Sequence, residues 1–156
     1  SVFNGYHTCY YQSFVVGPPS RTQLDIYRTT YDWLFSAAEM LKPGVSTADI
    51  ARQWPEAHTL GLNNEAEAFA LELGHGIGIT HWAKPVISRW FSIDHPETLE
   101  EGMVFALETY NGSGNDAARI EEMFVIEKDG ARQLSKFPSK NLISVPTAGN
   151  ILPPVE

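Results

Sequence analysis

The first forty residues change from a strand-like to a helix-like pattern of apolar positions. Residues 6–16 are rich in Tyr, Phe and Val and follow the turn signal Asn4-Gly5, which predicts one strand of a hairpin that ends at Gly17-Pro18-Pro19. From Ser20, apolar residues recur at spacings of three and four, as in an amphipathic helix that stops at Pro43-Gly44. The predicted apolar stripe consists of Leu24, Tyr27, Tyr31, Leu34, Ala38 and Leu41.

Shorter elements are predicted next. Ser46 and Asp49 have the spacing of a capping box, in which a hydroxyl accepts from an amide in the first turn of a helix. Pro55 limits that second helix to about two turns. Residues 65–70 are rich in Glu and Ala, and both a helical turn and a loop fit them.

The second half of the chain has the pattern of strands. Residues 74–79 are glycine-rich, 103–109 form an apolar run, and 119–127 form another, which turns at Lys128-Asp129-Gly130 into 131–136. A proline-containing tail, 144–156, follows. Helices gathered before strands predict an α+β fold, in which a mostly antiparallel sheet carries its helices on one face.

Composition and charge narrow the class of protein. With 156 residues, 43% of them hydrophobic, we expect a single domain over residues 1–156. The net charge of −8 and the absence of a Lys/Arg run argue against nucleic-acid binding. No apolar run reaches the roughly 20 residues of a membrane span, and no signal peptide is evident. Cys9 is the single cysteine, which excludes an internal disulfide and fits a cytoplasmic location.

Three side chains on or near predicted strands are candidates for metal binding: His75, Glu108 and Glu121. Taken singly, each is a residue type that is common at surfaces and strand ends. Glu108, however, directly follows the apolar run 104–107, where a carboxylate is unfavourable unless it is paired or bound to a cation. Two carboxylates and an imidazole can together hold a divalent transition metal.

The order of the segments around these residues resembles the pita-bread metallopeptidases, the superfamily of creatinase, Xaa-Pro dipeptidase, aminopeptidase P and methionine aminopeptidase. The matching segments read GHGIG at 74–78, GMVFALE at 102–108, RIEE at 119–122, NGYH at 4–7, KPGV at 42–45 and LSKFP at 134–138. The resemblance implies the C-terminal part of a pita-bread catalytic domain with a curved sheet. The family's catalytic domain has two pseudo-symmetric halves and is considerably longer than 156 residues, so the missing half would leave apolar sheet exposed. We therefore expect a homodimer or a longer parent chain.

The resemblance also implies a metal site. The family binds two divalent ions (zinc, iron, manganese or cobalt) through two Asp, one His and two Glu, and the last three correspond to His75, Glu108 and Glu121. Cys9 stands at the position of one Asp, and the other position falls before Ser1. Two alternatives remain open. Cys9 is either the fourth ligand of a single ion or a small buried residue at a site that binds no metal.

A second departure concerns substrate binding. Peptidases of the family have a histidine seven residues after the motif histidine, and here that position is Trp82, with His81 one place earlier. If the segment is a strand, these two side chains face opposite sides. Trp82, His81 and His7 are the candidates for contact with substrate, whereas His58 and His95 are expected at the surface.

Three functions are consistent with these residues. The first is a hydrolase in which metal-activated water attacks an amide bond of a short peptide, with His75 and Glu108 as catalytic residues. The second is a non-peptidase member acting on a small molecule, either a creatinase-like amidinohydrolase or a dimethylsulfoniopropionate-type lyase, with altered or no metal. The third is a catalytically silent fragment or pseudoenzyme.

Overall fold

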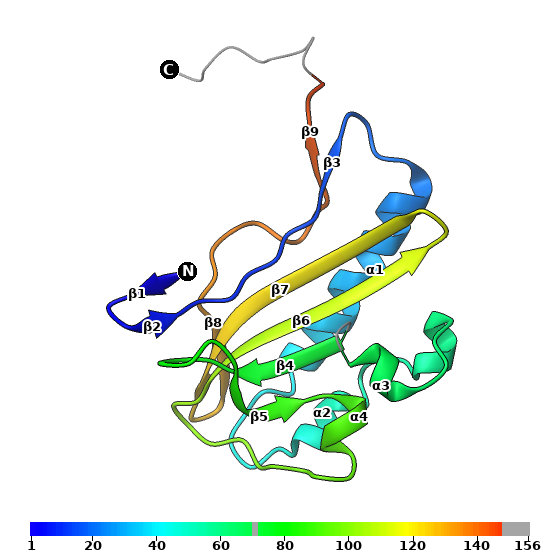
Figure 1. Cartoon of the computed structure of the whole chain (residues 1–156). Helices are drawn as coiled ribbons and strands as arrows, with labels where there is room; N and C mark the ends of the chain where they lie inside the picture. The colour runs from blue at the N-terminus through cyan, green and yellow to red at the C-terminus, as the bar shows by residue number, and fades with distance from the viewer. Residues whose placement is uncertain (70–71, 148–156) are drawn as a thin grey trace.

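A five-stranded antiparallel sheet forms the centre of the fold (Figure 1). The computed structural model describes residues 1–69 and 72–147, and only the backbone of Glu72 and Leu73. The strand order is β5-β4-β6-β7-β8. The strands are β4 (Glu72–Gly76), β5 (Ala83–Ile87), β6 (Val104–Ser113), β7 (Asp116–Glu127) and β8 (Gly130–Gln133). The predicted turn at 128–130 joins β7 to β8, and the α+β class is confirmed.

Helix α1 (Arg21–Ala38) covers one face of β6 and β7 (Figure 1). Its buried side includes Tyr27 and Leu34 of the predicted stripe, together with Ile26 and Thr30. Leu24 of that stripe is 42% exposed, because it faces an open cleft between the helix and residues 140–142. The predicted burial of Leu24 is therefore wrong, while the helix itself is confirmed.

The apolar core lies between α1 and the sheet and extends beneath the short helices. Phe105 and Leu107 of β6 are fully buried there, as is Leu41 just beyond α1. Trp54 closes one end of this core and donates its indole N–H to Thr109 Oγ1 at 2.7 Å. The core face of the sheet is thus occupied by packing, which leaves the opposite face for chemistry.

The start of α1 gives a prediction about stability. Ser20 Oγ accepts from the Gln23 amide at 3.1 Å, and the Gln23 side chain accepts in return from the Ser20 amide at 2.9 Å. Ser20→Ala removes one half of this capping box, so we expect the free energy of unfolding to fall by about 1 kcal/mol. Urea unfolding would measure the change. Ser20→Asp is the control, because aspartate also caps helices, and an equal loss in both variants would contradict this explanation.

Residues 6–16 do not form the single predicted strand. Strand β1 (Val2–Phe3) pairs with β2 (Tyr6–His7) across the Asn4-Gly5 turn, Tyr11 pairs with Glu121, and β3 (Phe14–Val16) pairs in parallel with β9 (Ile143–Val145). The segment therefore has three neighbours in succession, whereas a continuous strand requires a continuous neighbour. The predicted tail likewise contains β9, while its residues 148–156 lie outside the described part of the chain.

Two of the short helices, α2 (Thr47–Ala51) and α4 (Arg89–Ser92), pack against β5. Helix α2 begins at Ser46, whose hydroxyl accepts from the Ala48 amide. The predicted capping box with Asp49 is wrong, because that carboxylate pairs with Arg52 at 3.0 Å instead. The other short helices are η1 (Ala57–Leu60) and α3 (Glu65–Ala68). Residues 65–68 are thus helical, and 70–71 lie outside the described residues. No helix in the described ranges is long and apolar enough to cross a bilayer.

Candidate metal centre

The pairing of three strands brings the candidate ligands to one face of the sheet. Glu108 of β6 lies directly opposite Glu121 of β7. His75 of β4 lies opposite Ala106, two residues before Glu108 on the same strand. Because alternate residues of a strand face the same side, the three side chains share the face that points away from α1.

Cys9 reaches this face from the N-terminal segment. The Glu121 amide donates to the Tyr11 carbonyl at 3.0 Å, which aligns residues 8–13 with the edge of β7. Ser13 extends the contact, because its hydroxyl bonds both the amide and the carbonyl of Arg119. Cys9 lies two residues before Tyr11 and is half-buried beside Glu121.

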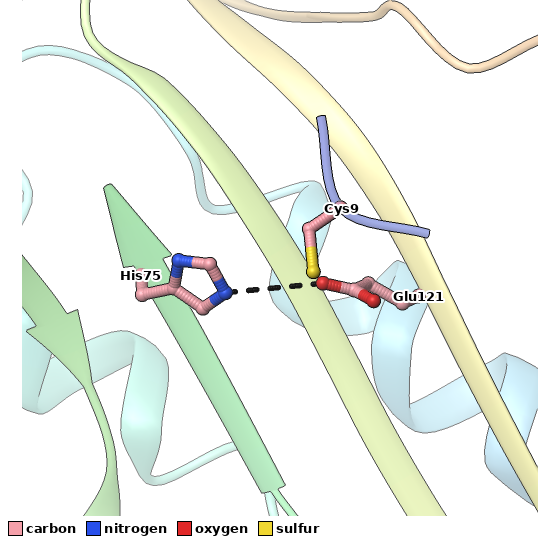
Figure 2. Close-up of side chains that lie close together, drawn as sticks. All are labelled: Cys9, His75 and Glu121. Carbon is pink, nitrogen blue, oxygen red and sulfur yellow. Dashed lines mark ion pairs between the residues drawn. The ribbon is translucent and has the colours of Figure 1, made fainter. Parts of the chain in front are cut away.

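The side chains of Cys9, His75 and Glu121 point toward one another (Figure 2). One possible ligand atom from each, the thiol sulfur, an imidazole nitrogen and a carboxylate oxygen, lie within 4.8 Å of one another. His75 Nε2 is 3.8 Å from Glu121 Oε1. Three of the four predicted ligands are therefore gathered in one cluster, and Glu108 is not in it.

The backbone orients the His75 ring. Its Nδ1 lies 3.1 Å from the Gly76 carbonyl oxygen, which can only accept, so Nδ1 carries the proton and Nε2 presents a lone pair to Glu121. Burial lowers the pKa of His75, which favours the neutral, metal-binding form. Gly76 itself has no room for a side chain, because a Cβ there would lie 2.6 Å from the Lys84 carbonyl oxygen.

Glu121 is a buried carboxylate whose polar neighbours in the cluster are the Cys9 thiol and the His75 imidazole. The residue is 0% exposed, and neither of its oxygens accepts a hydrogen bond from an N–H or O–H group of the described residues. Burial raises its pKa to about 7, a hydrogen bond from the Cys9 thiol acts in the opposite direction, and the nearby Glu108 adds to the rise. Burial also raises the pKa of the Cys9 thiol to about 12, and the adjacent Glu121 and Glu108 add to this. A divalent ion would compensate for the burial of these groups, and the sulfur, nitrogen and oxygen donors fit one.

Glu108 has the partner that its apolar surroundings require, and that partner is Arg119. The guanidinium donates through Nε, at 3.0 Å, and through Nη2 to the same oxygen, Oε2. Arg119 also lies over the ring of Tyr11, 4.5 Å from its centroid. Oε1 of Glu108 is left out of the ion pair. Sequence reasoning assigned Arg119 no role, although its position two residues before Glu121 already placed it on the same face.

The candidate substrate-binding residues lie beside the cluster. The His75 ring is 6.1 Å from that of Trp82 and 6.3 Å from that of His81, which is 6.0 Å from that of His7. The expectation that His81 and Trp82 face opposite sides is wrong, because residues 78–82 form bends and strand alternation does not apply. His58 and His95 are exposed, as predicted.

One buried acidic residue was missed altogether. Glu122 is 0% exposed on the core face of β7, where it accepts a hydrogen bond from the Ser135 hydroxyl. The sequence carries a usable signal, since Glu122 directly follows Glu121 in a strand and must therefore face the opposite side. It lies away from the cluster and does not extend it.

A model of the metallopeptidase family M24 matches residues 1–128. This chain belongs to that family. The M24 chain is 29% identical over 140 residues to the Xaa-Pro dipeptidase of Pyrococcus furiosus, an alignment that covers 87% of this chain and 38% of that protein. It is 28% identical over 134 residues to methionine aminopeptidase A of Synechocystis, which covers 83% of this chain and 51% of the relative.

Solved structures agree with the sequence relatives. Dipeptidase PepE from Mycobacterium ulcerans superposes with a TM-score of 0.74 at 27% identity, covering 92% of this chain and 37% of that one. X-Pro aminopeptidase from Thermotoga maritima has the same fold, with a TM-score of 0.75 at 23% identity over 93% of this chain and 39% of that one. The pita-bread fold is thereby confirmed. The M24 chain corresponds to under two fifths of either structure.

Proposed function

We propose that this chain is the metal-binding part of a hydrolase that cleaves an amide bond in a short peptide. The observation that carries the proposal is the fully buried Glu121 carboxylate, which accepts no N–H or O–H hydrogen bond from the described residues and faces Cys9 and His75. Membership of a metallopeptidase family also supports a metal-dependent hydrolase. Dipeptides with proline in the second position are the first substrates to test, because several relatives are Xaa-Pro dipeptidases.

The side chains around the cluster have distinct roles in this proposal. When bound, a divalent ion polarises a carbonyl group and lowers the pKa of water. Glu108 holds and passes the proton at Oε1, while Arg119 keeps Oε2 in place. The backbone bond at Nδ1 keeps Nε2 of His75 free as a ligand. His81 is exposed beside this ring and can donate an N–H to the substrate carbonyl.

Metal removal tests the proposal. Protein stripped with a chelator should hydrolyse Xaa-Pro dipeptides at least about 100-fold more slowly than protein given back one divalent ion, because a metal stabilises developing charge by several kcal/mol. Amino-acid release would be measured by mass spectrometry for zinc, iron, manganese and cobalt in turn. His75→Ala should abolish the metal-restored rate. His58→Ala should leave it unchanged, because that imidazole is exposed and lies outside the cluster.

Two outcomes of the metal-removal experiment would contradict the proposed hydrolase activity. If no added metal restores hydrolysis of any peptide in the panel, although the protein binds the ion, the proposed activity is wrong, and the non-peptidase and the silent pseudoenzyme remain. If His58→Ala and His75→Ala lose activity equally, the loss does not come from the cluster.

A second candidate is a non-peptidase that acts on a methylated or otherwise bulky small molecule. Trp82, 48% exposed, stands edge-on to Phe69 with ring centroids 6.4 Å apart, and Phe69 stands edge-on to Trp90 at 5.1 Å. Such a row of aromatic rings beside His75 can pack against methyl groups or a cation. Creatine and dimethylsulfoniopropionate in the same assay test this candidate, and turnover of either one in place of the peptides would favour it.

A further inference from the structure

We propose that Cys9 binds the metal as a thiolate and makes this a one-ion centre that prefers thiophilic metals, zinc and cobalt(II), over manganese. The inference rests on the proposed metal dependence but concerns a different property, the identity and number of ions. Cys9, His75 and Glu121 supply one sulfur, one nitrogen and one carboxylate oxygen. Thiolate ligands favour zinc, whereas manganese and magnesium favour sites made of oxygen.

The spacing of the three side chains fits a tetrahedral ion. Two ligands of a tetrahedral zinc lie about 3.5 Å apart, given metal–ligand distances of about 2.0–2.3 Å. His75 Nε2 and Glu121 Oε1 are 3.8 Å apart, and all three ligand atoms lie within 4.8 Å of one another. Cys9 comes from a segment outside the five-stranded sheet, so its position is not fixed by the strand register that holds His75 and Glu121.

An independent observation indicates that something charged belongs in the cluster. Glu121 is 0% exposed, and neither of its oxygens accepts a hydrogen bond from an N–H or O–H group of the described residues. Buried carboxylates in proteins are paired or bound to a metal. The two side chains that join Glu121 in the cluster are Cys9 and His75, and cysteine and histidine are both common metal ligands.

Arg119 explains why a single ion is expected. Its guanidinium already neutralises Glu108 through Oε2, so that the carboxylate does not require a second cation. Glu108 lies outside the cluster of Cys9, His75 and Glu121, so it is not counted among the ligands. One thiolate, one imidazole and one carboxylate give three protein ligands, which leaves one position of a four-coordinate zinc open to water or substrate.

Cobalt(II) gives a readout that does not depend on catalysis. Binding of cobalt(II) to a thiolate produces a charge-transfer absorption in the near ultraviolet, and Cys9 is the one cysteine of the chain, so no other residue can cause it. The band should saturate at one equivalent of cobalt(II) in the wild-type protein. It should be absent from Cys9→Ser and Cys9→Asp, both of which keep a small polar side chain at this position.

Metal competition measures the preference itself. The ratio of zinc to manganese affinity should be at least about 10-fold higher in the wild type than in Cys9→Asp, since aspartate replaces the soft ligand by a hard one. Zinc should also slow the alkylation of Cys9 by iodoacetamide in the wild type. His58→Ala serves as the control and should leave the band, the ratio and the alkylation rate unchanged.

The outcomes separate this inference from the proposed function. Cobalt(II) binding without the band, two bound ions per chain, or an equal metal ratio in wild type and Cys9→Asp would each overturn the thiolate centre. Metal-dependent hydrolysis in that same protein would leave the proposed function standing. If manganese binds to Cys9→Asp but no metal binds to the wild type, Cys9 disables the site and both proposals fail.

Discussion

Arg119→Ala is expected to lower the free energy of unfolding by about 3 kcal/mol, because it leaves the Glu108 carboxylate buried without its counter-charge. Glu108 is only 6% exposed, and both guanidinium bonds go to its Oε2. The figure is at the low end for a broken buried pair because the Arg119 side chain is 33% exposed. Loss of the stacking on Tyr11 adds to the effect. Urea unfolding of the metal-free protein would measure it.

The chain contains a matched control for this experiment. Arg132 pairs with Glu127 at 2.6 Å, but both side chains are more than half exposed, so Arg132→Ala should change stability by less than about 1 kcal/mol. Adding Glu108→Gln to Arg119→Ala should recover part of the loss, since the unpaired charge is then gone. If the two arginine variants lose equal stability, burial of Glu108 is not the cause.

Glu121→Gln is expected to weaken metal binding by at least about 100-fold, because it removes a proposed ligand and even supporting residues around metal sites contribute about 10- to 100-fold. The same substitution should stabilise the metal-free protein, since it replaces a fully buried carboxylate, which accepts no N–H or O–H bond from the described residues, by a neutral amide of similar size. Calorimetric titration with zinc would give the first quantity and urea unfolding the second. This opposition of sign is what distinguishes a ligand from an ordinary core residue.

The pH dependence provides a further check on Glu121. Burial raises its pKa to about 7 from an ordinary 4.5, so the folded state binds a proton that the unfolded state releases. This contribution to the stability of the metal-free protein is complete below about pH 4.5 and is lost as the pH rises through about 7. Glu121→Gln should lack this component of the pH profile. Identical profiles for wild type and variant would contradict the assignment.

The regular elements of the fold were predictable because their patterns are local. The stripe of α1 and the apolar runs of β6 and β7 each identify a face within one segment, and the structure confirms all three. The prediction of a single strand over residues 6–16 was wrong for the opposite reason. Their conformation depends on β1, Glu121 and β9, neighbours that no local pattern reveals.

The site was predictable in its residues but not in its interactions. Residue type near predicted strands, together with the family resemblance, selected His75 and Glu121, and the position of Cys9 followed from the same resemblance. The pairing of Glu108 with Arg119 depends on the register of β6 against β7. That register places Arg119 opposite Tyr110, two residues after Glu108 on the same strand. The nearness of His81 and Trp82 to His75 depends on bends, whose geometry an alternating pattern does not describe.

The route of residues 8–13 along β7 has a consequence for dynamics. This segment is joined to the sheet by the Glu121–Tyr11 bond and the Ser13 hydroxyl, whereas His75 and Glu121 are held in a continuous ladder of strands. Segments held by few hydrogen bonds open locally, without global unfolding. Each such opening carries Cys9 away from the other two side chains, so amide hydrogen exchange in residues 8–13, more than the melting temperature, should report how long the three-residue cluster stays assembled.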